Sequence, residues 1–284
     1  MTHLIAFIDG SNYSQSVCDH AAWMAKRTNA SVDLIHVLGR RSVGSSPADL
    51  SGNLKLGARS ALLAELAELD AQSTKLELRR GRILLDEAEQ RLKDAGVETV
   101  TSKLRHSDVV ETVQEFEGGA DAIIIGKRGE AADFAKLHLG SNIERVVRAA
   151  TKPVFVASRA FRPINSFMIA YDGGESAEKA VRHIAQGKLF TDIHCSIVTF
   201  GKPRPDAEKR LEQAAARLRS AGYDVDASFI DGEPDRAIKQ KIEENKIDLL
   251  VMGAYGHSRM RHLIIGSTTT EMVRSCLVPV MMFR

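Results

Sequence analysis

Short apolar runs alternate with longer amphipathic segments along the chain. Apolar runs without polar alternation predict strands buried on both faces, and a regular succession of strand and helix predicts a parallel sheet covered by helices on both sides. Helices of the second half are expected at Ser176–Gln186, Asp206–Ala221, Asp235–Asn245 and Ser267–Ser275. Strands are expected at Leu4–Ile8, Val32–Leu38, Glu98–Leu104, Ala122–Ile125 and Val154–Ala157 in the first half, and at Phe167–Tyr171, Ile193–Phe200, Asp224–Ile230, Leu249–Met252 and Val280–Phe283 in the second.

One arrangement of glycines occurs twice. A strand runs into a Gly-x-x-Gly loop, a spacer follows, and a Gly-Ser pair opens an amphipathic helix. The spacer has ten residues in the first copy and nine in the second. This repetition predicts an internal duplication with domains at 1–160 and 165–284. The shared positions, first copy then second, are Asp9 and Asp172, Gly126 and Gly253, Gly129 and Gly256, Gly140 and Gly266, Ser141 and Ser267, and Pro153 and Pro279.

The first copy contains an insertion. Asp9 and Pro153 are 144 positions apart, whereas Asp172 and Pro279 are 107 apart. The extra residues fall at about 40–80, where a Ser- and Gly-rich stretch precedes a helical pattern with Leu62, Leu63, Leu66 and Leu69 on one face. We interpret this helix as a cover for the core of its own domain. A dedicated partner surface is the alternative.

Composition narrows the class of protein. The chain of 284 residues suits two domains, each with its own core, and its net charge of +2 gives no reason to expect a nucleic-acid partner. No apolar stretch approaches the roughly 20 residues of a membrane span, and no signal peptide is evident, so we expect no membrane partner and a cytoplasmic protein. Cys18, Cys195 and Cys276 form no metal-binding or disulfide pattern and are expected to be small core or half-exposed residues.

The glycine loop is suited to binding an anion. Glycine lets backbone N–H groups converge on a ligand, and the N-terminus of a helix adds unpaired N–H groups with a positive dipole end. The alternative is that the glycines only turn the chain and that the Gly-Ser pair only caps a helix. Arg259 and Arg261 are candidate phosphate contacts, but a cationic loop is usually solvated. His257 and His262 lack a carboxylate and a third ligand at metal-binding spacing, so no metal site is expected.

These residues resemble the universal stress protein family in its tandem form. The most specific match is Gly-x-x-Gly, nine residues, then Gly-Ser in the second half, together with Asp172 after its first strand. The resemblance implies two Rossmann-like domains, each a five-stranded parallel sheet of order 3-2-1-4-5. It implies a stress-response protein that binds ATP, AMP or another adenine nucleotide, with Mg²⁺ as an optional companion.

The resemblance also assigns site residues. In the second half, Asp172 would hold the adenine side and the backbone near Val198 the base, while Gly253, Gly256, Gly266 and Ser267 would hold ribose and phosphates. In the first half, a second site would use Asp9, Val37, Gly126, Gly129, Gly140 and Ser141. Its longer spacer, with Glu130 and Asp133 in the loop, makes nucleotide binding there less favoured. The two domains would pack through their last strands, and two chains would form a homodimer.

No catalytic residues are predicted. The loop lacks the Lys that follows the last glycine of a P-loop, and neither Asp9 nor Asp172 is followed by a dinucleotide fingerprint. The favoured hypothesis is therefore a nucleotide-responsive binding module. A slow ATPase or nucleotidyl-transfer enzyme in the same crevice is the alternative, and a non-nucleotide or lipid-like ligand is the third possibility.

Overall fold

The structure is a computed structural model that describes residues 1–39, 56–127, 141–202, 205–254 and 267–284, with side chains of the later segments described from 63, 142 and 268 onwards. Its strands are β1 (His3–Ile8), β2 (Ser31–Leu38), β3 (Val100–His106), β4 (Ala122–Gly126), β5 (Val154–Ala157), β6 (Ser166–Ala170), β7 (His194–Phe200), β8 (Val225–Ile230), β9 (Leu249–Gly253) and β10 (Val280–Phe283). Its helices are α1 (Ser14–Thr28), α2 (Leu56–Asp94), α3 (Val109–Phe116), α4 (Ser141–Ala149), α5 (Glu175–Gln186), α6 (Pro205–Ser220), α7 (Pro234–Glu244) and α8 (Ser267–Ser275), with a short 3-10 turn η1 (Glu117–Gly119).

The strands form one ten-stranded sheet in the order β3-β2-β1-β4-β5-β10-β9-β6-β7-β8. Each half therefore has the predicted order 3-2-1-4-5, and all pairs within a half are parallel. The halves join where β5 and β10 pair antiparallel, with Phe155 opposite Met281. The expectation that the halves pack through their last strands is confirmed.

The core is organised by sheet face and not by half. One hydrophobic cluster packs α1, α2, α5 and α6 against the sheet, and the other packs α3, α4, α7 and α8 against the opposite face. Each cluster contains residues of both halves, such as Phe155 and Phe167 in the first and Val156 and Met282 in the second. Because the β5–β10 pairing joins the two halves, the sheet and both apolar layers are continuous across them.

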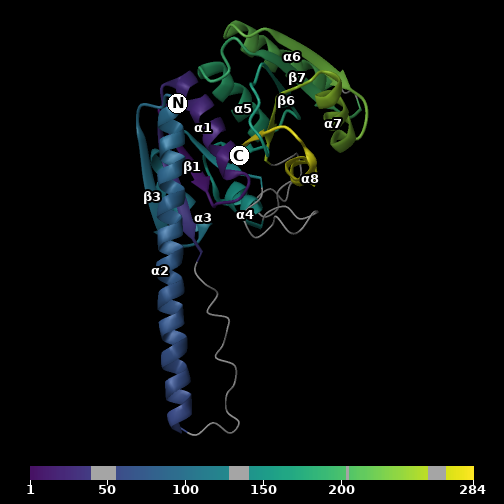
Figure 1. Cartoon of the computed structure of the whole chain (residues 1–284). Coiled ribbons are helices and arrows are strands. Elements are labelled where there is room, and N and C mark those ends of the chain that lie inside the picture. Colours follow the sequence, from purple (N-terminus) through teal and green to yellow (C-terminus); the bar gives the residue numbers. More distant parts are fainter. Residues whose placement is uncertain (40–55, 128–140, 203–204, 255–266) are drawn as a thin grey trace.

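Helix α2 is far longer than the insertion pattern suggested. Its last turns pack on the sheet through Leu85, Ala88 and Leu92. Gly81 permits this approach, since a Cβ there would lie 2.8 Å from Leu104 Cδ1 and 2.9 Å from His36 Cδ2. The first part of the helix extends well past the sheet (Figure 1). The interpretation as a core cover was wrong for Leu63, Leu66 and Leu69, which are exposed, and the side chain of Leu62 lies outside the described residues.

Side chains also tie the two halves together. Arg27 on α1 donates Nε–H to the carbonyl of Leu189 over 2.6 Å. The Trp23 ring lies 6.4 Å from that of Phe190. These contacts link α1 of the first half to the segment after α5. Among the described residues, no helix combines the length and apolarity that crossing a membrane requires.

Candidate functional site

The switch point of the second half lies between β6 and β9. These neighbouring parallel strands pair with Ala170 opposite Met252, so Asp172 and Gly253 leave the sheet at the same rim. Strand order reverses here, since β6 continues toward β7 and β9 toward β10. Crevices at such reversals, outside the carboxyl ends of the strands, are where open α/β sheets bind ligands.

Asp172 is exposed and forms a tight turn. Its Oδ1 accepts a hydrogen bond from the backbone N–H of Gly174 over 2.8 Å. Asp9 does the same in the first half, where Ser11 N–H donates to Asp9 Oδ1 over 3.0 Å. The turn role of both aspartates is therefore visible in the structure, and the ligand role remains a prediction.

Gly253 lets β9 approach the first turn of α5. A Cβ on Gly253 would lie 2.9 Å from Ser176 Cβ and 3.3 Å from the backbone nitrogen of Ala177. The Thr269 hydroxyl on α8 donates to the Gly253 carbonyl over 3.1 Å. This glycine therefore has a packing role at the point where α5, β9 and α8 meet.

Strand register decides which residue of the second strand lies level with each aspartate. In the first half, Ile8 pairs with His36, so Val37 lies level with Asp9. In the second half, Ala170 pairs with Val198, so Phe200 lies level with Asp172. Val198 is fully buried, and its carbonyl accepts from Tyr171 N–H over 2.8 Å. Phe200 is thus the structural counterpart of Val37, two residues beyond Val198.

Part of the predicted loop lies outside the described residues. This applies to Gly256, Gly266, His257, His262, Arg259 and Arg261 in the second half, and to Gly129, Gly140, Glu130 and Asp133 in the first. The side chains of Ser141 and Ser267 are also outside, but α4 begins at Ser141 and α8 at Ser267, as predicted. The two Gly-Ser pairs therefore mark helix starts.

The two helix starts differ in charge. The first turn of α8 contains no acidic residue. The first turn of α4 contains Glu144, which pairs with Arg148 over 2.7 Å. A carboxylate near a helix N-terminus competes with an anionic ligand for the same positive potential, and the start of α8 lacks such a competitor in its first turn.

Lys127, which follows Gly126 in the first copy, contacts the other half. Its side chain is buried, and Nζ donates to the backbone carbonyl of Cys276. Cys276 follows directly after α8, so the first-copy loop begins with a contact to the other half.

Sequence analysis missed one arginine beside each switch point. A methyl group on Gly173 would lie 3.3 Å from Nε of Arg210, which comes from α6. A methyl group on Gly10 would lie 3.5 Å from a terminal nitrogen of Arg80, which comes from α2. Both arginines come from the helix that follows the second strand of their half. Alignment of the two halves could have matched α2 with α6, but the two helices differ in length, so the two arginines do not fall at the same aligned position.

The cysteines are confirmed as core residues. All three are buried with free thiols. Burial raises the pKa of Cys18 to about 12 and raises the pKa of Cys195 and Cys276, so these thiols are protonated and inert at neutral pH. Within the described residues, no group of three or more His, Cys, Asp or Glu side chains could hold a metal ion.

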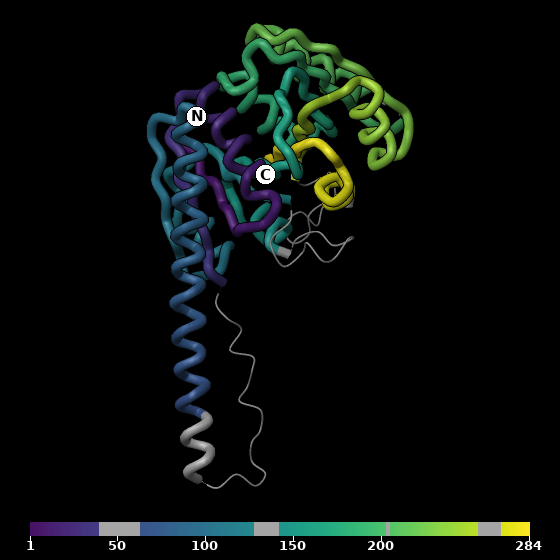
Figure 2. The backbone as a smooth tube through the Cα atoms, in the orientation of Figure 1, coloured from purple at the N-terminus to yellow at the C-terminus, as the bar shows by residue number. Residues whose placement is uncertain are grey.

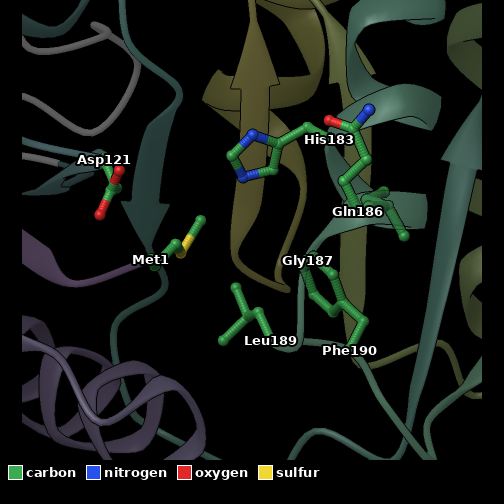
Figure 3. Close-up of a pocket in the computed structure, with 8 residues that line it drawn as sticks. Met1, Asp121, His183, Gln186, Gly187, Leu189 and Phe190 are labelled. Atoms are coloured by element: carbon green, nitrogen blue, oxygen red, sulfur yellow. The ribbon is translucent and has the colours of Figure 1, made fainter.

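A small cavity lies at the junction of the halves, away from the switch point. Its volume is about 130 Å³, well below the roughly 300 Å³ at which ligand pockets begin. Met1 and Asp121 precede β1 and β4, so the cavity lies at the amino ends of these strands (Figure 3). It is therefore not a nucleotide site. Its lining residues are Met1, Asp121, His183, Ile184, Gln186, Gly187, Leu189 and Phe190.

Comparison with known proteins identifies the family. The profile of the universal stress protein family matches residues 1–158 and 196–284. The chain belongs to the universal stress protein family. The universal stress protein Slr1230 of Synechocystis sp. is 36% identical over 287 residues, which cover 100% of both chains. A universal stress protein of Mycolicibacterium smegmatis is 23% identical and covers 99% of this chain and 96% of its own.

Solved structures of the family share the fold. A universal stress protein from Archaeoglobus fulgidus superimposes with a TM-score of 0.73 at 21% identity, covering 99% of this chain and 98% of that one. A second structure, from Pseudomonas aeruginosa, gives a TM-score of 0.61 at 16% identity, covering 100% of this chain and 93% of that one. The tandem arrangement is therefore shared over nearly the whole chain.

Proposed function

We propose that this universal stress protein binds an adenine nucleotide, ATP or AMP, in the crevice between β6 and β9, and acts in the cytoplasm as a nucleotide-responsive regulatory module. The observation that carries the proposal is the placement of Asp172 and Gly253 at one rim of neighbouring strands where strand order reverses. Membership in the family supports the same ligand class.

The proposed contacts follow from this placement. Asp172 stands on the adenine side, and the backbone of Phe200, level with it, replaces the region near Val198 as the base contact. The glycines Gly256 and Gly266 and the start of α8 at Ser267 receive the phosphates, since that helix start contains no acidic residue in its first turn. Any Mg²⁺ enters with the phosphates.

The first-half crevice is proposed as the weaker site. Glu144 adds negative charge at the start of α4, and Lys127 donates a hydrogen bond to the carbonyl of Cys276 in the other half. The nucleotide therefore binds first in the second half.

Mass spectrometry of ligand released from the purified protein, followed by calorimetric titration with ATP and AMP, tests the proposal. Ser267→Ala removes a hydroxyl donor to a charged oxygen and is expected to weaken binding about 10-fold or more. Ser141→Ala, at the corresponding position of the first half, is the matched control and should leave the tighter site unchanged. Equal effects of the two substitutions, or no adenine compound bound at millimolar concentration, would refute the assignment.

A turnover assay with Mg²⁺ separates binding from catalysis. We expect ATP to be retained with negligible phosphate release. Rapid release of phosphate that Ser267→Ala abolishes would establish an enzyme in place of a binding module.

A further inference from the structure

The projecting part of α2 exposes apolar side chains that the fold leaves uncovered. Of the six large apolar side chains exposed in the described part of the chain, five lie on this helix. From residue 63 to residue 72 every side chain is exposed. The five are Leu63, Leu66, Leu69, Leu76 and Ile83, between 45% and 66% exposed.

A helix that projects alone needs a partner. The stretch 56–78 would extend about 35 Å at 1.5 Å per residue. Most helical stability in proteins comes from packing of an apolar face, and the apolar side chains described in this stretch are exposed instead. Figure 2 shows the chain trace of α2 leaving the body of the molecule.

The exposed residues recur with the spacing of a coiled coil. Leu69, Leu76 and Ile83 are seven residues apart, and Leu66 precedes Leu69 by three. These are the a and d positions of a heptad. The remaining a positions hold Ser73 and Arg80, and polar residues there reduce stability while fixing register and orientation. A groove of about 440 Å³ lies beside Leu76 and Ile83 and offers space for side chains of a second helix.

We propose that two copies of this chain pair through their α2 helices, side by side and antiparallel. The distribution of charge selects both the partner and its direction. From residue 56 to residue 70 the helix contains three acidic residues against the single basic Arg59, and from residue 71 to residue 83 it contains four basic residues against the single acidic Glu77. The three acidic residues are Glu65, Glu68 and Asp70, and the four basic residues are Lys75, Arg79, Arg80 and Arg82. Antiparallel pairing brings the acidic part of each copy against the basic part of the other.

The heptad makes this complementarity specific. Glu65 and Arg79 both occupy g positions, and g positions face each other in antiparallel pairs. In the register that places Leu66 opposite Leu76 of the second copy, Glu65 lies opposite Arg79 of the second copy, and symmetry repeats the pair. A parallel pair would instead place Glu65 near Asp70 of the second copy at two symmetry-related positions, and like charges there repel. The antiparallel register contains one like-charge contact, between the two copies of Asp70 at the e positions. Since β5 and β10 pair with each other within the chain, these last strands are not available for the contact between two copies.

Sedimentation equilibrium of the full chain tests the pairing. Wild-type protein at micromolar concentration is expected at twice the chain mass of 31.1 kDa. Leu66→Gln with Leu76→Gln should shift it to the monomer, because both substitutions remove apolar contact across the seam. Ala64→Gln with Ala71→Gln, on the outward f positions of the same exposed helix, is the matched control and should leave the dimer intact.

Crosslinking tests the direction, since the native cysteines are buried. Chains with Glu65→Cys should form disulfides with chains that contain Arg79→Cys, and neither should link with itself. Circular dichroism of each variant verifies that the fold is retained. A monomeric wild type at 100 μM would overturn the proposal, as would a dimer that survives Leu66→Gln with Leu76→Gln. If the protein is a monomer that binds lipid vesicles, the exposed face of α2 is assigned to a membrane. If it is a monomer that the same substitutions destabilise, the face is assigned to residues 40–55.

Discussion

His20 is a buried histidine held neutral by its surroundings. It is 0% exposed and lies between the rings of Phe155 and Phe161, at centroid distances of 5.2 and 5.0 Å. Nδ1–H donates to the Ser16 carbonyl over 2.7 Å, and Nε2 has no hydrogen-bond partner among the described residues. Burial lowers its pKa to about 4, against 6.5 for a free histidine.

Stability should therefore fall as the solution is acidified. Between pH 6.5 and pH 4 the unfolded chain binds a proton at His20 and the folded chain does not, so the free energy of unfolding decreases by roughly 3 kcal/mol across this window. Urea unfolding at pH 7.5 and pH 4.5 measures the decrease, and His20→Gln should reduce it. Burial also lowers the pKa of His183, so part of the decrease persists in the variant. An unchanged difference would contradict the assignment to His20.

Some of the candidate site residues were predictable from the sequence and others were not. Asp172, Gly253 and the helix start at Ser267 are readable because each follows an apolar strand or opens an amphipathic helix. The predicted Val198 lies two residues before Phe200, which is level with Asp172. An apolar run does not show how neighbouring strands align, so the sequence could not give this offset. Arg210 was missed because its proximity to Gly173 arises only after α6 folds back over the turn.

At the scale of elements, strand β9 depends on the absence of a side chain at Gly253. Gly253→Ala places a methyl group against Ser176 Cβ and the backbone of α5, where neither neighbour can rotate away. Overpacking of this kind costs about 1–3 kcal/mol. Chemical denaturation should show this loss for Gly253→Ala, while Gly118→Ala, which has no atom within 4 Å of its added methyl, serves as the control. A Gly253→Ala protein as stable as the wild type would show that α5 shifts without cost.

The ten strands and the helices of the second half were predictable because continuous apolar runs separated by amphipathic segments have few competing interpretations. Helix α2 was predicted less well. Its periodicity reveals an apolar face, but the pattern is the same whether that face covers its own core or another chain. The exposed leucines decide against the first of these.

At the scale of the whole molecule, the shared sheet predicts a single unfolding transition. The two halves have common apolar layers and are joined by β5–β10, so neither can unfold without exposing core of the other. Fluorescence of Trp23, the sole tryptophan, reports α1 and its contact with Phe190 of the second half, and circular dichroism reports the helices and strands of both halves. The midpoints of the two signals in urea should coincide. Separate midpoints would indicate independent halves.

The antiparallel junction also limits how the sheet can grow. With β5 and β10 in the middle, the outermost strands are β3 and β8. β3 contains Lys103 and Arg105, and β8 contains Asp226. Charged residues on outer strands discourage the addition of further strands, the first step toward fibres and insoluble aggregates. Because its halves pair through β5 and β10, the duplicated chain buries these apolar strands in the middle of the sheet and has charged residues on both edge strands.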